Sequence, residues 1–410
     1  MSLPATWTIK LLSEISEFIT KGATPTTYGF GWVKTGIPFL RSECVAENGL
    51  NLQPAMRISQ QAHYVLRRSA ISDGDILMTI TGNVGRVIRL PSGFGEGNIN
   101  QHIARIRIND NNCNSLFVYY YLLQWKIRQS YYRILTGQAY PQISLEQVRD
   151  TKIILPPLPE QRKIAEILST WDDAIEKLDQ LIEKKKLLKK GLMQQLLTGK
   201  RRFPGFTEPW REVRLGEVVD LRFSNVDKKS VVGETAVKLC NYMDVYRNQT
   251  IHGRIPFMTA TASESQIRNF RLAKGDLLFT KDSETPDDIA VPSVVEEDLD
   301  HVICGYHLAL ARPNPALVNG FFLAQLFRHQ KYRNEFSRMA NGAVRYGLNL
   351  SEAKKITLMI PMIDEQDLIA SALSLIDLEI SAINSKLDLL QQQKRGLMQQ
   401  LLTGKIRVKT

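Results

Sequence analysis

The side chains that could do chemistry in this chain are few, and their spacing fits no enzyme motif. Thr198-Gly-Lys-Arg201 is similar to the end of a phosphate-binding loop, but Gln194 stands where GxxxxGK needs its first glycine, and no strand precedes it. The chain lacks the Asn-Pro-Pro-Tyr and Asp-Pro-Pro-Tyr motifs of amino-methyltransferases, and its nearest glycine cluster, Gly93-Phe-Gly-Glu-Gly97, is typical of a turn. We therefore predict a protein that is not an enzyme, with no catalytic residue, no cofactor, no bound metal and no small-molecule substrate.

Two other groups leave alternatives open. An acidic run could suit the metal of a nuclease, although a solvated loop is the simpler interpretation. This run consists of Asp282, Glu284, Asp287 and Asp288. His102 and His307 begin two similar segments, and each is read first as a core or strand-end histidine, next as a DNA contact and last as a catalytic group.

Composition and charge favour a globular protein with a polyanionic partner. The 410 residues are 43% hydrophobic and 23% charged, and Lys plus Arg exceed Asp plus Glu by 53 − 42 = 11. This excess is typical of nucleic-acid binding, but some basic proteins have no such partner. The four scattered cysteines form no CxxC pair and are expected to be free thiols. No signal sequence opens the chain and no run approaches the roughly 20 apolar residues of a membrane span, so we expect a soluble cytoplasmic protein with no membrane partner.

The strongest organising signal is an internal repeat. Gly191-Leu-Met-Gln-Gln-Leu-Leu-Thr-Gly-Lys200 recurs letter for letter as Gly396 to Lys405, an offset of 396 − 191 = 205 residues. A repeat of two units is not a solenoid. It indicates two domains of similar fold, each followed by a long helix and related by an internal pseudo-two-fold axis.

The two copies agree in patches and diverge between them. Ser72 to Thr79 matches Ala273 to Thr280, a Gly-Asp turn that leads into a short apolar strand, and the segments that begin at His102 and His307 also predict strands. Helices are expected over 116–129 and 319–336. Each globular part is therefore predicted to be α+β.

The closing segments of both copies carry the heptad pattern of a coiled coil. In the second copy, the steps between apolar positions alternate four and three. These positions are Ile369, Leu373, Ile376, Ile380, Ile383, Leu387, Leu390, Leu397 and Leu401. Lys394 interrupts the stripe, and Lys185 of the first copy stands where the second copy has Leu390. We predict that the two helices pair antiparallel and separate the domains; two amphipathic helices lying on their own cores are the alternative.

A basic run lies on the first of these helices. It consists of Lys184, Lys185, Lys186, Lys189 and Lys190. Such a run is usually a solvated face. The alternative is that it contacts DNA phosphates without sequence preference.

Several of these motifs resemble one family, the specificity subunits of type I restriction-modification systems. The resemblance rests on Leu155-Pro-Pro-Leu-Pro-Glu-Gln161, on the two Leu-Leu-Thr-Gly segments, on Gly22-Ala-Thr-Pro25 and on Leu239-Cys-Asn-Tyr-Met-Asp-Val-Tyr246, and it covers essentially the whole chain. It implies two target-recognition domains, each of which reads one half of a bipartite, asymmetric site in double-stranded DNA. It also implies that the helices set the gap and dock two methyltransferase (modification) subunits, to which restriction subunits can be added.

On this basis we divide the chain into a first target-recognition domain (1–155), a central helix (156–203), a second target-recognition domain (204–358) and a C-terminal helix (359–410). Loop-borne polar side chains are the types that read base edges. In the first domain these are Thr26, Thr27, Tyr28, Arg41, Thr81, Asn83, Arg86, Gln101, Gln138, Tyr140 and Gln142. In the second they are Asn241, Tyr242, Arg247, Lys281, Ser283, Tyr306, Arg345 and Tyr346. The alternative function is a stand-alone sequence-specific DNA-binding regulator; a pure assembly scaffold fits the diverged domains and the positive charge less well.

Overall fold

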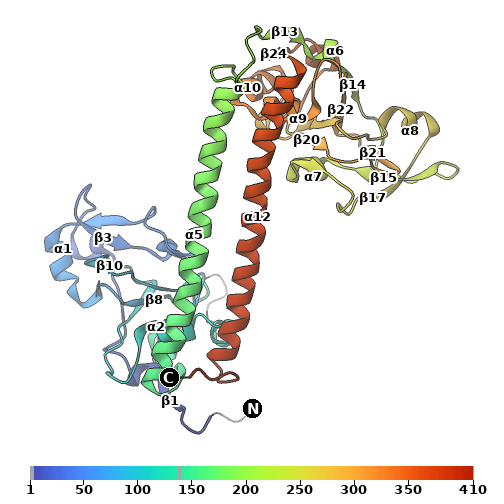
Figure 1. Cartoon of the computed structure of the whole chain (residues 1–410). Helices are drawn as coiled ribbons and strands as arrows, with labels where there is room; N and C mark the ends of the chain where they lie inside the picture. The colour runs from blue at the N-terminus through green and yellow to red at the C-terminus, as the bar shows by residue number, and fades with distance from the viewer. Residues whose placement is uncertain (1–3, 137–139, 410) are drawn as a thin grey trace. The chain divides into compact units, whose positions relative to one another are not determined.

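The computed structural model describes residues 4–136 and 140–409 and divides into two units (Figure 1). The first unit spans the chain up to Asp179 together with the segment from Ser385 onward, and the second runs from Gln180 to Asn384. Each unit therefore holds one globular part, the first half of the long helix that follows it and the last half of the other long helix.

The predicted long helices are present and pack together. They are α5 (Leu158–Leu196) and α12 (Ile363–Leu401), each of 39 residues. In the second unit, Lys185 Nζ donates to Glu379 at 2.6 Å and Lys189 Nζ to Asp377 at 2.6 Å. The partner's number falls as the lysine's rises, so the helices are antiparallel there, as the heptad pattern predicted.

The lysines that interrupt the apolar stripe are paired with acids. Lys189 and Lys394 are 205 residues apart, and so are their partners, Asp377 and Asp172. The prediction of a solvated basic face was therefore wrong for Lys185 and Lys189, because acids of α12 hold both. Lys184 and Lys190 are exposed.

The same carboxylates also fasten the helix pair to the globular parts. In the first unit, Tyr120 OH donates to Asp172 at 2.6 Å. In the second unit, Gln325, which lies 205 residues after Tyr120, donates through Nε2 to Asp377 at 3.2 Å. Each aspartate thus joins two helices and one domain within its own unit.

Among the described residues of the first unit, the strands form two four-stranded sheets and two short pairs. The sheets are ordered β6 (Met56–Ile58), β3 (Ile37–Leu40), β10 (Gly97–Ile99), β7 (Ala70–Ile71), and β2 (Thr20–Lys21), β11 (Ile103–Ile106), β8 (Ile76–Thr79), β9 (Val87–Arg89). The pairs are β1 (Thr8–Leu11) with β12 (Lys152–Leu155), and β4 (Val45–Ala46) with β5 (Gly49–Leu50). Its short helices are α1 (Gln60–Val65), α2 (Ser115–Leu122), α3 (Trp125–Tyr132) and α4 (Leu145–Arg149).

The second unit repeats this plan with one five-stranded and one three-stranded sheet. They are ordered β14 (Val219–Phe223), β22 (Leu308–Pro313), β18 (Leu277–Thr280), β20 (Pro292–Val295), β16 (Thr250–Ile251), and β17 (Met258–Ala262), β15 (Thr235–Cys240), β21 (Val302–Cys304). The pairs are β13 (Arg211–Arg214) with β24 (Thr357–Ile360), and β19 (Asp282–Ser283) with β23 (Tyr346–Gly347). The short helices are α6 (Leu215–Val218), α7 (Tyr242–Arg247), α8 (Glu264–Phe270), α9 (Gly320–Arg328), α10 (Gln330–Met339) and α11 (Leu350–Lys354).

The α+β prediction and the matched strands are confirmed, whereas the two predicted short helices are each divided in two. Strand β8 lies antiparallel to β11, and β18 lies antiparallel to β22. Gln124 and His329, each with an extended backbone, separate α2 from α3 and α9 from α10. The prediction of single helices over 116–129 and 319–336 was wrong because apolar spacing continues through a break of two residues in the first unit and of one residue in the second.

The repeated Gly-Asp turns are explained by buried ion pairs. Asp75 accepts from Arg107 Nε at 2.7 Å, and Asp276 accepts from Arg312 Nε at 2.9 Å. Both aspartates are almost fully buried. Each turn is therefore fastened to the neighbouring strand, because Arg107 directly follows β11 and Arg312 lies in β22.

The ten-residue repeat is explained by packing at the end of each long helix. Leu196 and Leu197 belong to the core of the second unit, and Leu401 and Leu402 to that of the first. Gly199 follows with φ +69°, and a Cβ there would lie 3.3 Å from the ring of Trp210. The same sequence is thus needed twice because it meets equivalent surroundings twice.

The Glu-Gln pair near the start of each long helix is also structural. Glu160 accepts a two-point ion pair from Arg407 (2.5 and 2.7 Å), and Glu365 accepts one from Arg202 (3.0 and 2.6 Å). Gln161 accepts from the backbone N–H of Asn114 at 2.8 Å, and Gln366 accepts from that of Asn319 at 3.0 Å. All four helix residues are buried. The glutamates join the beginning of one long helix to the segment after the other, and the glutamines join each long helix to its own globular part.

Helix α12 is long and apolar enough to cross a membrane by length and composition alone. The prediction that no segment meets that test was therefore too strict. Ile369 and Leu373 of this helix lie in the core of the second unit, and Asp377 and Glu379 pair with lysines of α5. These contacts are those of an amphipathic helix in a helix pair.

Candidate nucleic-acid interface

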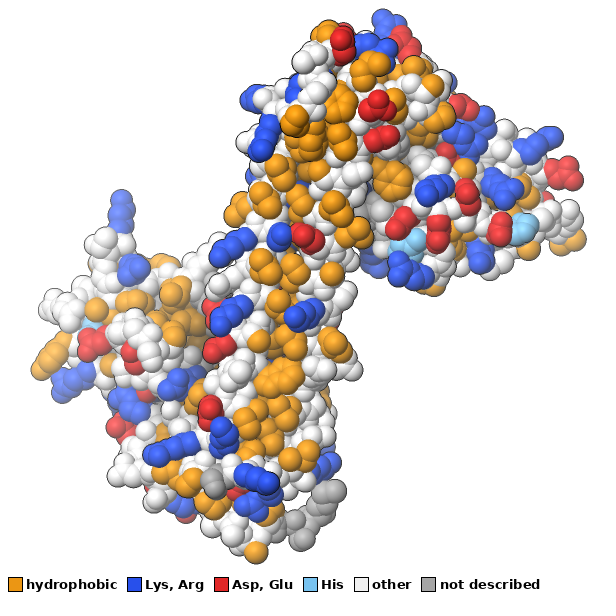
Figure 2. All heavy atoms as spheres, in the orientation of Figure 1, with side chains coloured by type: hydrophobic (Ala, Val, Ile, Leu, Met, Phe, Trp, Pro, Cys, Tyr) orange, Lys and Arg blue, Asp and Glu red, His pale blue; other side chains and the backbone are white. Residues whose placement is uncertain are grey.

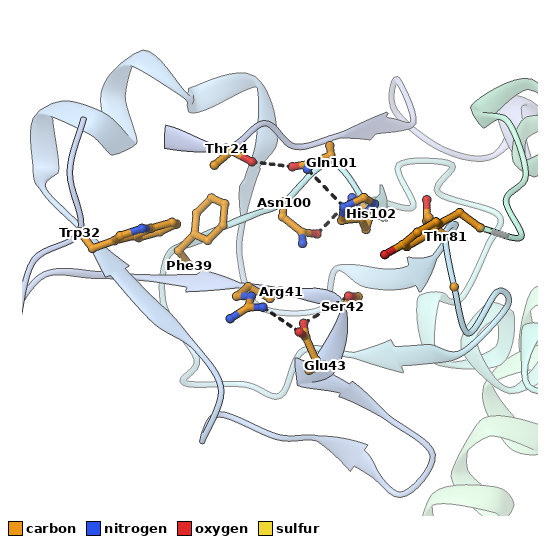
Figure 3. A pocket seen from close by; sticks show the side chains of 12 residues that line it. Thr24, Trp32, Phe39, Arg41, Ser42, Glu43, Thr81, Asn100, Gln101 and His102 are labelled. Atoms are coloured by element: carbon orange, nitrogen blue, oxygen red, sulfur yellow. Dashed lines mark hydrogen bonds and ion pairs between the residues drawn. The ribbon is translucent and has the colours of Figure 1, made fainter. Parts of the chain in front are cut away.

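The first unit carries a polar hollow of about 350 Å³ (Figure 3). Gln101 lies near its centre: its Oε1 accepts from Thr24 Oγ1 at 2.8 Å, and its Nε2 lies 3.2 Å from His102 Nε2. The backbone N–H of His102 donates to Asn100 Oδ1 at 3.1 Å. One wall is apolar, with Trp32 and Phe39 packed edge to face at 5.2 Å. The hollow therefore offers polar donors and acceptors beside an aromatic surface.

Four of the predicted contact residues meet at this hollow. They are Arg41, Thr81, Gln101 and Tyr140. Arg41 donates to Glu43 at 2.8 Å, and its side chain is still about half exposed. Gln142 lies beside them, because its backbone bridges to Thr81 and Thr136.

The other predicted residues of the first domain that the structure describes lie outside the hollow. Thr26, Thr27 and Tyr28 are exposed on the short turn that follows Thr24, and Asn83 is exposed in the loop after β8. Arg86 is engaged with Glu47, which Arg128 also binds. Gln138 lies outside the described residues.

The second unit gathers most of its predicted residues around Asp282. His307 Nδ1 and Arg345 Nη2 each lie 2.7 Å from Asp282 Oδ1. Tyr306 packs against the ring of His307, and Lys281 Nζ lies 4.4 Å from the centre of the Tyr306 ring. These side chains form one cluster of charged and aromatic groups, which we call the Asp282 cluster.

Three more predicted residues adjoin the Asp282 cluster. Ser283 and Tyr346 pair through their backbones, and Tyr242 OH lies 3.1 Å from Ser283 Oγ. Asn241 immediately precedes α7, and Arg247 is exposed at the far end of that helix, apart from the cluster.

Not every predicted cation here is free to bind DNA. Lys281 Nζ donates to the carbonyl oxygen of Ser224 at 2.9 Å. Burial lowers the pKa of Lys281 below its ordinary value. Lys281 is therefore better placed to orient Tyr306 than to reach a phosphate.

The acidic run is the favoured solvated loop only in part: Glu284 and Asp287 are exposed, whereas Asp282 and Asp288 are engaged. Asp282 binds His307 and Arg345, and Asp288 accepts from Tyr246 OH at 3.0 Å and Thr285 Oγ1 at 2.8 Å. Among the described residues, no group of three or more His, Cys, Asp or Glu side chains is placed to hold a metal ion. The acids here organise neighbouring side chains.

The hollow and the Asp282 cluster occupy equivalent places in the two units. Strands β8 and β18 end in Thr79 and Thr280, whose hydroxyls accept from the backbone N–H of Arg86 (3.0 Å) and Val291 (2.9 Å). Two residues later stand Thr81 and Asp282, which pair with Gln142 and Gly347. His102 and His307 also correspond, as do Tyr140 and Arg345, at the offset of 205. The same backbone thus presents different side chains.

Sequence reasoning missed several residues that organise these places. Asp282 and His307 were not among the predicted contacts, nor were Thr24, Asn100 and Trp32. The repeat offset was the available signal for His307, since it pairs the two histidines. Nothing in the sequence links Asp282 to Arg345, 63 residues away.

The fold and these two places define a class: a tandem protein in which similar α+β domains on paired helices carry unlike polar faces. Comparison with known proteins narrows that class. The type I restriction modification DNA specificity domain matches residues 4–185 and again 207–392. The MjaVIII type I restriction enzyme specificity subunit of Methanocaldococcus jannaschii is 23% identical over 423 residues, covering 100% of this chain and 95% of its own. The MjaX type I restriction enzyme specificity subunit of the same organism is 24% identical over 429 residues, covering 100% of this chain and 95% of its own.

Two solved structures share the fold. The type I restriction-modification S subunit from M. genitalium has a TM-score of 0.60 and 16% identity, and covers 98% of both chains. The second is a chain in a solved structure of the type I R-M system, which describes complex assembly and conformational transition. Its TM-score is 0.59 at 18% identity, and the match covers 99% of this chain and 100% of that one.

The chain belongs to the type I restriction modification DNA specificity domain family. It is a DNA specificity subunit of a type I restriction-modification system. Such a subunit is itself non-catalytic.

Proposed function

We propose that each unit reads one half of a bipartite, asymmetric site in double-stranded DNA. The observation that supports this most is that the two units share their backbone and buried contacts but differ in the exposed side chains at equivalent positions. The Thr79 and Thr280 hydroxyls, the buried Asp–Arg pairs and the paired backbones are alike in both units. The side chains at the equivalent tips, Tyr140 and Arg345, are unlike. A common frame with different donors and acceptors is what reading two different half-sites requires.

The base-reading surface we propose includes the hollow of the first unit and the Asp282 cluster of the second. The turn over residues 25–28 and the exposed Asn83 and Arg247 would contribute contacts at its edges. Residues 1–155 and 204–358 would then be the target-recognition domains, and 156–203 and 359–410 the spacer helices. The protein would work in the cytoplasm, where the DNA is.

The long helices, we propose, fix the gap between the half-sites. Lengthening both helices together tests this. One heptad inserted after Asp179 and another after Asn384 would keep the apolar stripe and both Lys–Asp pairs intact. The insert adds about 10 Å at about 1.5 Å per residue. The selected gap is therefore expected to lengthen by up to about 3 base pairs, at about 3.4 Å each, with both halves unchanged.

The measurement is sequencing of duplexes that the full-length chain, bound to its modification subunit, selects from a random pool. A matched control carries the heptad in α5 alone, which shifts Lys185 and Lys189 away from their acids and should unfold the helix pair. A change in the bases read, with an unaltered gap, would contradict a spacer role.

The helices are also the proposed docking surface for two modification subunits, to which restriction subunits would be added. Hydrophobic side chains gather on the visible face of the paired helices, between Lys, Arg and acidic groups (Figure 2). In the second unit, Leu181 and Leu188 of α5 lie one heptad apart, as do Leu368 and Leu375 of α12, and all four are exposed. Exposed apolar side chains in a row favour a protein partner.

The exposed leucines of the second unit can be changed without altering the first unit. The double variant L188D/L375D is expected to weaken the binding of one modification subunit at least tenfold, because two exposed apolar side chains become charged in the second unit alone. Native mass spectrometry of the mixed subunits should then show complexes with one modification subunit in place of two. Lys184→Gln and Lys190→Gln, at exposed lysines of α5, serve as the control. Unchanged stoichiometry and affinity would contradict docking on this surface.

A stand-alone DNA-binding regulator is the second candidate. It would select its site without any partner, so the duplex selection is run with and without the modification subunit. Full discrimination by the chain alone would favour the regulator.

A further inference from the structure

The second unit holds an arginine on a tightly closed loop. Asn341 and Gly347 exchange backbone hydrogen bonds of 3.0 and 2.9 Å, so Arg345 lies in the loop that they close. Gly342 has φ +145°, and a Cβ there would lie 1.9 Å from the carbonyl oxygen of Arg345. β23 (Tyr346–Gly347) joins the loop to β19. The backbone of Arg345 is therefore held close to Asp282.

The guanidinium of Arg345 is fixed at one corner only. Its Nη2 donates to Asp282 Oδ1 at 2.7 Å, and the same oxygen accepts from His307 Nδ1 at 2.7 Å. Within the part of the chain that the structure describes, Nε and Nη1 of Arg345 have no partner. The arginine side chain is 58% exposed, whereas that of Asp282 is 17% exposed. A mostly buried carboxylate thus holds one corner, Nη2, of a guanidinium whose donor edges are otherwise accessible.

A fork held in this way suits one base above the others. Guanine presents two acceptors, O6 and N7, side by side in the major groove, and arginine bonds both at once. Because Asp282 already holds Nη2, the loss of side-chain entropy when Arg345 binds a base is smaller. We propose that Arg345 reads a guanine in the half-site of the second unit, with Asp282 and His307 as positioning residues; this rests on the proposed two-part reading of DNA.

The first unit has different side chains at the equivalent positions. At the positions equivalent to Arg345 and Asp282 it has Tyr140 and Thr81, which line the hollow. Neither side chain is charged, and neither has the paired donors of a guanidinium. The first unit therefore reads its matching position by another contact, and the guanine belongs to the second half-site alone.

The experiment uses the full-length chain in complex with its modification subunit and a pool of duplexes with the second half-site randomised. The parent complex should select guanine at one position of that half-site. Arg345→Lys and Arg345→Ala should lower discrimination at that position about ten- to a hundredfold and leave the first half-site unchanged. Asp282→Asn should lower it less, and Asp282→Asn combined with Arg345→Ala no further than Arg345→Ala alone. Arg268→Lys, at an exposed arginine of α8 in the same unit, is the matched control.

Three other outcomes would overturn the inference. A uniform loss of affinity with an unchanged selected sequence would make Arg345 a phosphate contact. An unaltered selection in Arg345→Ala would leave the arginine with no part in reading. A loss of discrimination in Arg268→Lys equal to that in Arg345→Lys would remove the special role of the loop. Thermal unfolding of each variant identifies any that fails to fold, and Arg345→Lys then remains the informative change. A parent complex that selects no two-part sequence would refute the proposed function instead.

Discussion

Replacement of Asp377 by asparagine is expected to lower the free energy of unfolding of the chain by about 3–5 kcal/mol. Asp377 accepts from Lys189 through both carboxylate oxygens, at 2.6 and 2.7 Å, and from Gln325 at 3.2 Å. The side chain of Lys189 is only 12% exposed. Arg328 lies nearby, and burial lowers its pKa to about 10 while Asp377 acts in the opposite direction. The amide would leave two partly buried cations, Lys189 and Arg328, without their counter-charge.

Urea unfolding monitored by circular dichroism measures this change. Asp388→Asn is the matched control, since that aspartate is exposed on the same helix, and should alter stability by less than about 0.5 kcal/mol. The double variant Lys189→Met/Asp377→Leu should recover part of the loss, because an apolar pair can replace an ion pair at little cost while Arg328 and Gln325 still lack the carboxylate. Equal stability of Asp377→Asn and Asp388→Asn would show that the pair contributes nothing to holding the helices.

The largest functional effect is expected from duplicating one domain. Replacement of residues 8–155 by residues 211–360 gives a chain with the second domain in both places. The selected DNA is then expected to change from two unlike halves to an inverted repeat of the second half-site, with the gap retained. The reason is the internal two-fold relation that the repeat predicts, because identical readers related by a two-fold axis bind a site with the same symmetry.

The structure indicates that such a chain can fold. The transplanted domain would meet α5 through the same groups that it uses on α12. Gln366 accepts from the Asn319 N–H, and its equivalent, Gln161, is present on α5. Asp172 has on α5 the position that Asp377 has on α12. It can therefore accept the hydrogen bond from Gln325 of the transplanted domain. A thermal unfolding curve with one transition at a temperature near that of the parent would verify the assembly.

The repeat made most of the scaffold predictable. Letter-for-letter identity at an offset of 205 residues located both long helices, and their heptads predicted the antiparallel pair, because a sustained apolar stripe has few other ways to be buried. The same offset matched the Gly-Asp turns and the histidine strands. What it could not supply was the partner of each charge. In the sequence, Lys189 only interrupts the apolar stripe. The structure shows that it forms an ion pair with Asp377.

The candidate interface was less predictable for a physical reason. Loop residues are brought together by the strands beneath them, so Asp282, His307 and Arg345 meet although sequence separates them widely. Residue type alone favoured Lys281 as a DNA contact, but its amine is bound to Ser224. The breaks at Gln124 and His329 were missed because burial continues on both sides of each.

The central claim is that unlike readers in the two units each recognise their own half of the site. The most direct test is sequencing of the duplexes selected by the parent complex and by the duplicated-domain complex. The account predicts two different halves at a fixed gap for the parent, and the second half with its inverted copy at the same gap for the duplicated chain. A parent site that is already symmetric, or a duplicated chain that still selects the original first half, would contradict it.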